Sequence, residues 1–251
     1  MEINQLKESI YKAVSSATKE RKKIGIAFSG GVDSSLLAKV CKDLGKDLLL
    51  LTVGLKGSHD LKAAIEASKQ IGLPLVTYEI NEKEIAKDME KVSAVCGKAR
   101  FQDLEICAVN YYVFKLASEQ KIKTVLNASG IDELFCGYEK FCRIFEDDEA
   151  INSMIKKEVV IALESKMLKD KIAAIFNVKN IEPFLEKSFI EFAVQMPVNT
   201  KIKNAGDKLR KHAIREVAAG IGLPVEMAMK QKKAMQYGSG LHKAIRKIPK
   251  I

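Results

Sequence analysis

The feature that most constrains the fold is an alternation of short apolar segments with segments of helical period from residue 5 to residue 128. The apolar segments, expected to form strands, cover residues 23–28, 47–53, 75–80 and 124–128. The segments of helical period cover residues 5–20, 32–44, 58–71, 82–94 and 101–119. Because this alternation is typical of strands joined by helical crossovers, we predict an α/β fold with a doubly wound parallel sheet.

The pattern changes after Gly137. From there to Ile251 the apolar spacing is helical, and we expect no strand. We therefore divide the chain near Phe145, into an α/β region at 1–145 and a helical C-terminal portion at 146–251.

Composition and hydropathy restrict the class of protein further. A chain of 251 residues with 47% hydrophobic content can bury a full core without covalent staples. Its longest apolar run, Leu48–Val53, is far too short to cross a bilayer, and its first residues do not resemble a secretory signal. We therefore expect a cytoplasmic location and no membrane span.

Metal-binding and disulfide-forming residues are sparse. The five cysteines are odd in number and never occur as C-x-x-C, which argues against a disulfide framework and a zinc site. The three histidines lie far apart in the sequence. We expect buried, reduced thiols, and we expect any metal to be bound by carboxylates.

Positive charge is concentrated in the second part of the chain. Residues 151–251 hold 20 Lys and Arg against 9 Asp and Glu, whereas residues 1–150 are close to neutral. This asymmetry indicates an anionic partner, which could be a polyphosphate, an acidic substrate or RNA. A solvated, lysine-rich surface is the alternative interpretation.

A seven-residue segment, Ser29-Gly30-Gly31-Val32-Asp33-Ser34-Ser35, lies where the first expected strand gives way to a helix. Two adjacent glycines let an anion approach the backbone N–H groups, and serine hydroxyls at a helix N-terminus donate to phosphate oxygens. The segment lacks the lysine of the G-x-x-x-x-G-K-[ST] motif, so transfer of a γ-phosphate is disfavoured. An N-cap serine and a tight turn without a ligand remain the alternative.

Asp33 indicates a cation. A carboxylate inside an anion cradle repels phosphate unless a cation lies between them, and Mg²⁺ is the cation we expect. Asp132 follows the strand expected at 124–128 and therefore lies at the same edge of the sheet. Two carboxylates with phosphate oxygens and water suffice for Mg²⁺, although Asp132 could instead cap the next helix.

The segment SGGVDSS resembles the pyrophosphate loop (PP-loop) of the ATP pyrophosphatase superfamily, whose members cleave ATP to AMP and pyrophosphate. Nearly the whole chain is similar, in the same order of motifs, to the synthetase domain of glutamine-dependent asparagine synthetases and to β-lactam synthetase. The later motifs are Thr52–Leu55, Gly57–Ala64, Ile131–Tyr138, Glu182–Glu186, Lys208–Glu216, Gln231–Lys233 and Gly238–Gly240. The resemblance implies an adenine nucleotide alpha hydrolase-like fold, with residues 1–145 binding the nucleotide.

The same resemblance implies a reaction and its cofactors. ATP and Mg²⁺ would serve to adenylate a carboxylate, and ammonia or an amine would then displace AMP. Residues implied to bind ATP or pyrophosphate are Ser29, Gly30, Gly31, Val32, Asp33, Ser34, Ser35, Val53, Ser129 and Gly130. Asp33 and Asp132 are the implied metal ligands, and we expect Glu133 to be structural.

Two lysines are candidates for catalysis. Lys208 is spaced with Lys211 and Arg215 so that a helix would carry all three as one cationic stripe, which either faces pyrophosphate or is solvated. Lys232 matches the lysine with which the family stabilises charge during adenylate formation.

Three departures from the family pattern bear on the substrate. No hydrolase domain precedes the loop, so we expect free ammonia, another amine, or ammonia from a separate protein. Ser129 stands where asparagine synthetases have an acidic residue that helps to activate the nucleophile, and a serine is a poor base at neutral pH. The family's E-x-R is replaced by Lys179 and Ile181, so the sequence does not identify aspartate as the substrate.

Two other functions remain open at this stage. An RNA-modifying enzyme that adenylates a base oxygen would suit the basic second part of the chain, but aromatic residues for base stacking are sparse and no RNA-binding module fits. A catalytically silent nucleotide-binding subunit would suit Ser129. The identity of the acid is left open, and an oligomer is compatible with the sequence.

Overall fold

The computed structural model describes residues 2–230 and 235–248. Five parallel strands form one sheet in the order β3-β2-β1-β4-β5. Their bounds are β1 Lys23–Ala27, β2 Asp47–Gly54, β3 Leu75–Glu79, β4 Thr124–Leu126 and β5 Lys179–Ile181. Strands β2 and β3 are added on one side of β1, and β4 and β5 are added on its other side, so the sheet is doubly wound. The predicted fold class is confirmed.

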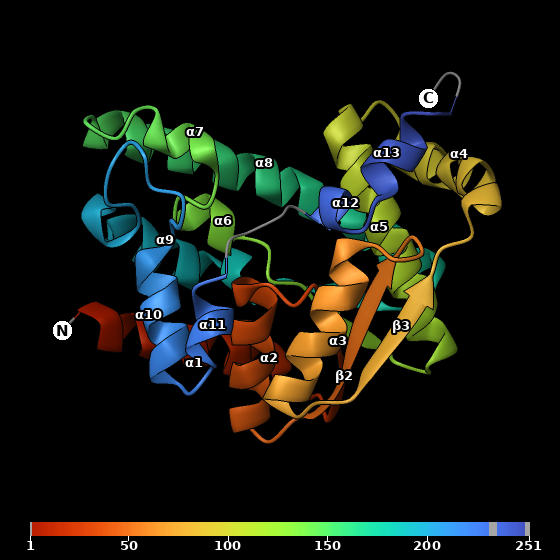
Figure 1. The fold of residues 1–251 in the computed structure, drawn as a ribbon, viewed down its shortest axis with the longest axis horizontal. Helices are drawn as coiled ribbons and strands as arrows, with labels where there is room; N and C mark the ends of the chain where they lie inside the picture. Colours follow the sequence, from red (N-terminus) through yellow and green to blue (C-terminus); the bar gives the residue numbers. More distant parts are fainter. Residues whose placement is uncertain (1, 231–234, 249–251) are drawn as a thin grey trace.

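Helices cover both faces of this sheet (Figure 1). Their bounds are α1 Glu2–Thr18, α2 Val32–Asp43, α3 His59–Ile71, α4 Ile85–Cys96, α5 Phe101–Glu119, α6 Ile131–Leu134, α7 Glu139–Cys142, α8 Asp148–Ile175, α9 Lys187–Gln195, α10 His212–Gly220, α11 Val225–Ala228, α12 Met235–Gly238 and α13 Leu241–Ile245. Short 3₁₀ helices lie at Glu82–Glu84, Pro183–Leu185 and Val198–Thr200.

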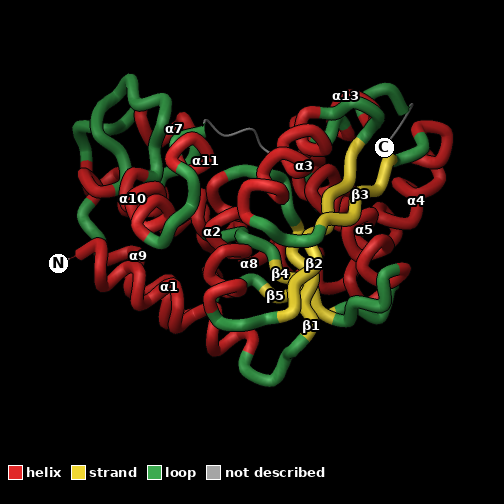
Figure 2. The backbone as a smooth tube through the Cα atoms, turned by 60° about the horizontal axis from the view of Figure 1, so that its bottom comes forward, coloured by secondary structure: helices red, strands yellow, loops and turns green. Residues whose placement is uncertain are grey.

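Apolar side chains gather in two clusters, one on each face of the sheet. One cluster joins Ile24 and Ile26 of β1 to side chains of α1, α2, α9 and α10. The other joins Leu51 and Val53 of β2 to α4, α5 and α13. The two groups of helices lie on opposite sides of the strands in Figure 2. Burial on both faces explains why β2 is a nearly continuous apolar run.

The expectation that no strand follows Gly137 is wrong. Residues 179–181 pair with β4 as the parallel strand β5, with Leu126 opposite Ile181. The strand is three residues long and begins Lys-Asn, so it lacks the apolar pattern by which strands are predicted. Residues on both sides of Phe145 share this sheet and the first apolar cluster.

The expectation for the cysteines is confirmed. All five cysteines are free and buried. Within the described part of the chain, no helix is long and apolar enough to span a membrane.

Candidate functional site

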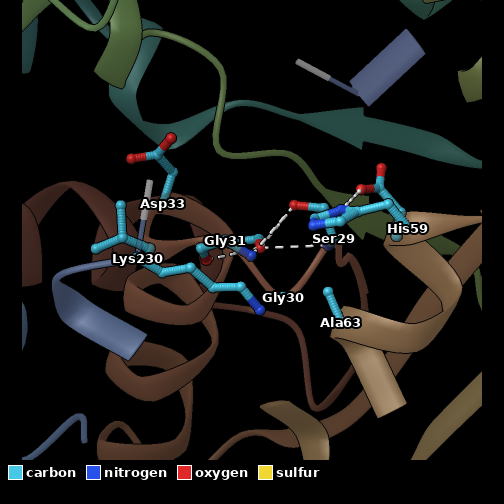
Figure 3. Close-up of a pocket in the computed structure, with 10 residues that line it drawn as sticks. Ser29, Gly30, Gly31, Asp33, His59, Ala63 and Lys230 are labelled. Atoms are coloured by element: carbon cyan, nitrogen blue, oxygen red, sulfur yellow. Dashed lines mark hydrogen bonds and ion pairs between the residues drawn. The ribbon is translucent and has the colours of Figure 1, made fainter. Parts of the chain in front are cut away.

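The loop between β1 and α2 forms a hollow at the carboxyl ends of the strands (Figure 3). The hollow is small, about 50 Å³, and opens to solvent. It is lined by Ser29, Gly30, Gly31, Val32, Asp33, Ser34, His59, Asp60, Ala63 and Lys230. Six of the predicted nucleotide-binding residues therefore line one surface. Ser35, the seventh residue of the loop, is buried in α2.

The conformation of this loop requires glycine at position 30. Gly30 has a φ of +70°, and a Cβ atom there would lie 2.6 Å from the carbonyl oxygen of Ala63 in α3. The serine hydroxyls brace the turn, since Gly31 N–H donates to Ser29 Oγ at 3.4 Å and Ser34 Oγ donates to the Gly31 carbonyl at 3.2 Å. The loop is thus held against α3 with backbone facing the hollow.

Asp33 and Asp132 converge as predicted. Asp33 lies in the first turn of α2, and Asp132 lies in α6, just after β4. Both carboxylates contact one cation, the ammonium of Lys211, at 2.7 Å from Asp33 Oδ2 and 3.1 Å from Asp132 Oδ1. The loops that follow β1 and β4 therefore line the same crevice, at the point where the strand order reverses.

The predicted cationic stripe on a helix is wrong. Helix α10 begins only at His212, so Lys208 and Lys211 precede it. Lys208 lies exposed in the preceding loop, whereas Lys211 is 1% exposed. Arg215 is buried, and its guanidinium donates to the backbone carbonyls of Leu209, Arg210, Ala228 and Lys230.

Backbone geometry places Lys211 in the crevice. Arg210 and Lys211 both adopt the left-handed region, with φ of 51° and 55°, which L-residues rarely occupy. The Asp207 carboxylate holds the turn by accepting hydrogen bonds from the N–H groups of Lys203, Leu209 and Arg210 and from His212 Nε2. Burial opposes the ionisation of Asp207, but these donors outweigh it and lower its pKa to about 2.

The β4 loop is fixed by Glu133. Its Oε2 accepts a hydrogen bond from Gly130 N–H at 3.0 Å, and its Oε1 accepts one from the Tyr138 hydroxyl at 2.5 Å. The structural role expected of Glu133 agrees with these contacts. Gly130 itself has a φ of +104°, and a Cβ there would lie 2.6 Å from the Phe184 carbonyl oxygen.

Other predicted site residues are placed differently. Val53 is buried in β2, and its role in nucleotide binding stays a prediction. Ser129 lies between β4 and α6 and accepts a hydrogen bond from Lys169. Lys232 lies outside the described residues. Lys230 was not predicted from the sequence, and its side chain extends beside Gly30 (Figure 3).

Comparison with known proteins identifies the family. The Asparagine synthase family model matches residues 5–147 and 145–248, which is nearly the whole chain. The chain belongs to the asparagine synthase family. The resemblance expected from the motifs is therefore confirmed.

Relatives within this family are distant. A Methanocaldococcus jannaschii protein assigned by name to the glutamine-hydrolysing asparagine synthetases is 29% identical over 98% of this chain and 50% of its own length. Asparagine synthetase B of Escherichia coli, also glutamine-hydrolysing by name, is 27% identical over 94% of this chain and 45% of its own. The chain thus spans half or less of the length of these two relatives.

A solved structure supports the fold assignment. NMN synthetase from Francisella tularensis aligns with a TM-score of 0.51 at 11% sequence identity, covering 94% of this chain and 77% of that one. At this identity the likeness concerns the fold alone. It agrees with a PP-loop α/β fold for the present family member.

Proposed function

We propose that this protein is an ATP-dependent, AMP-forming ligase that adenylates a carboxylate for attack by ammonia or an amine. The observation that carries the proposal is the convergence of Asp33 and Asp132 on one cation, beside a glycine turn at a helix N-terminus. Membership of the asparagine synthase family supports the same reaction class. We also propose that residues 1–145 bind the nucleotide and that residues 146–251 complete the domain.

The chemistry of the two carboxylates fits Mg²⁺. Among the described residues no three His, Cys, Asp or Glu side chains gather as metal ligands, so a metal here would need oxygens from the substrate. Mg²⁺ is commonly held by one or two carboxylates plus phosphate oxygens and water. Asp33 and Asp132 would hold it, and when bound it would neutralise the charge of the phosphates.

The remaining groups suit the departure of pyrophosphate. The N–H groups at the start of α2 and the hydroxyl of Ser29 are donors for the β- and γ-phosphates. Lys211 and Lys230 bring cationic charge to the same crevice. Such preorganised donors stabilise the charge that develops when the bond between the α- and β-phosphates breaks. We propose Lys232 and Lys208 as further cations of this kind.

The proposed reaction also needs a nitrogen nucleophile. The relatives are glutamine-hydrolysing by name, and this chain matches about half the length of each. We propose ammonia or a small amine as the nucleophile.

Pyrophosphate release is the test. The wild-type protein is incubated with ATP, Mg²⁺, ammonia and a panel of amino acids and other carboxylates, and the nucleotide products are separated. We expect AMP and pyrophosphate in amounts that depend on one acid, and a loss of about 100-fold or more in Asp33→Ala and Lys232→Ala.

Asp43→Ala is the matched control, because Asp43 lies at the other end of α2 in an exposed pair with Lys39. Formation of ADP and phosphate, or pyrophosphate release that no acid affects, would contradict the proposal.

A further inference from the structure

A buried ion pair lies behind the β4 side of the crevice. Lys169 of α8 is 4% exposed and Glu182, just after β5, is fully buried, and Lys169 Nζ lies 2.7 Å from Glu182 Oε1. Asn180 also donates to Glu182 Oε1, at 2.9 Å. Removing two charges from water is costly, so a pair kept in this place calls for an explanation beyond stability.

The pair contacts Ser129, in the segment that joins β4 to α6. Lys169 Nζ lies 2.9 Å from Ser129 Oγ, and Ser129 is partly exposed. Ser129 lies three residues before Asp132 of α6, and Asp132 faces the nucleotide loop across Lys211. The contact therefore lies next to the helix that carries Asp132 into the crevice.

The direction of this hydrogen bond is fixed by chemistry. A lysine ammonium can only donate, so Ser129 Oγ is the acceptor. The serine hydrogen is then left to donate elsewhere, and no acceptor for it lies in the described part of the chain. A hydroxyl that accepts a hydrogen bond from an ammonium is polarised by it and is a stronger donor.

We infer that Ser129 donates a hydrogen bond to an oxygen of the acid substrate, its carboxylate or the carbonyl of its adenylate, with Lys169 as the positioning residue. This inference rests on the proposed function and specifies how that site recognises the acid. Ser129 is then a hydrogen-bond donor to the acid, in place of the nucleotide-binding role that the resemblance implied for it. It does not act as the base that deprotonates the amine, since a hydroxyl bonded to an ammonium is a still weaker base than a free one.

Acid-dependent exchange of labelled pyrophosphate into ATP tests the inference, because it reports adenylation without the amine. The probe is the carboxylate that gives the largest exchange with the wild-type protein. For Ser129→Ala we expect the KM of this acid to rise about 10-fold to 100-fold while the KM of ATP is unchanged.

A second variant removes the cation without leaving a buried charge unpaired. The double variant Lys169→Met/Glu182→Gln keeps the side-chain volumes and leaves no isolated Glu182 carboxylate. We therefore expect it to remain folded. We expect the same selective rise in the KM of the acid. Lys157→Met, at an exposed position of the same helix, is the control.

Ser129→Glu distinguishes a role for residue 129 as a hydrogen-bond donor from a role as a general base. A carboxylate at this position removes the donor and repels the acid, so we expect exchange to fall at least as far as in Ser129→Ala. A gain in amide formation by Ser129→Glu would overturn the inference. So would an unchanged acid KM in Ser129→Ala or the double variant, or a rise confined to the KM of ATP.

Any of these overturning results would contradict the inference about Ser129 but not the proposed function, because the wild-type protein would still exchange pyrophosphate. If the wild-type protein shows no exchange with any acid, the proposed function fails and the inference fails with it.

Discussion

Lys211 places its ammonium 2.7 Å from Oδ2 of Asp33, although 178 positions separate the two residues in the chain. The same ammonium lies 3.1 Å from Asp132. A lysine thus holds the position between two carboxylates that a divalent cation would suit. This relationship leads to the first prediction.

Lys211→Met should destabilise the protein and increase its response to Mg²⁺. Loss of one partner of a buried ion pair costs about 3–5 kcal/mol, because the carboxylates remain without their shared cation. Mg²⁺ can then bind without displacing an ammonium. We expect the midpoint of thermal unfolding to fall, and millimolar Mg²⁺ to recover more of it than it adds to the wild type.

Lys39→Met is the control for this experiment. Lys39 forms an exposed i,i+4 pair with Asp43, and such pairs contribute roughly 0–1 kcal/mol. Equal Mg²⁺ responses in the Lys211 variant and the wild type would show that the aspartates do not bind the ion.

Gly30→Ala should disrupt the glycine turn. The substitution places a Cβ 2.6 Å from a backbone oxygen of α3 and also strains a φ of +70°. We expect a loss of about 2–4 kcal/mol in the free energy of unfolding by denaturant, together with loss of nucleotide binding.

Gly57→Ala separates backbone strain from steric overlap. Gly57 has the same φ of +70° as Gly30, but nothing lies within 4 Å of the added Cβ. It should cost about 1–2 kcal/mol. A similar cost in both variants would mean that α3 moves aside and that the close approach at Gly30 is unimportant.

The loop after β1 and the pairing of Asp33 with Asp132 could be predicted from the sequence, because both rest on local chemistry at strand ends. The lysine that faces them could not. Spacing places Lys208, Lys211 and Arg215 on one face of an assumed helix. The Asp207 carboxylate instead stabilises a left-handed turn before α10, and of the two lysines in this stripe it is Lys211 that reaches the crevice.

The contact between Ser129 and Lys169 could not be predicted from the sequence either. The two residues are 40 positions apart, and no sequence motif near either of them indicates a contact with the other. Strand β5 was missed because three residues with a polar start give no periodic signal.

Asp207 should make the protein sensitive to acid. Its pKa is lowered to about 2 from an ordinary value of 3.8, so the unfolded chain takes up the proton first as pH falls. Its stabilising contribution is therefore complete above about pH 4 and is lost as the pH falls toward 2. Asp207→Asn should be about 1–2 kcal/mol less stable at pH 7.

Denaturant unfolding of both proteins from pH 7 to pH 2 measures this effect. We expect the difference between Asp207→Asn and the wild type to shrink as the pH falls, and we expect the variant to bind ATP more weakly at pH 7 because Lys211 is misplaced. A difference that stays constant with pH would exclude ionised Asp207 as the group that holds the turn.

Lys201 should affect the stability of the protein at alkaline pH. Burial lowers its pKa from 10.5 to about 8, and its ammonium donates to the Ala193 carbonyl at 2.8 Å. Between pH 8 and 10.5 the unfolded chain binds more protons, so stability should rise with pH across this window. Below pH 8 the cost of the buried charge is present in full.

Lys201→Met removes that charge and should be more stable at pH 7, on the order of 1–3 kcal/mol. Its stability should be flat where that of the wild type rises. Unfolding curves at pH 7 and at pH 10 check both statements, and a variant that is less stable at both values would contradict them.

The sheet edge formed by β5 has a consequence for synthesis of the protein. Until Ile181 has left the ribosome, β4 presents an unpaired edge, and such edges are prone to pair with other chains. The cation that faces Asp33 arrives later still, at position 211, so the crevice is assembled by contacts between the two ends of the chain. Long-range contacts of this kind slow folding, and a nascent chain of this protein would be most vulnerable to aggregation between the emergence of β4 and that of β5.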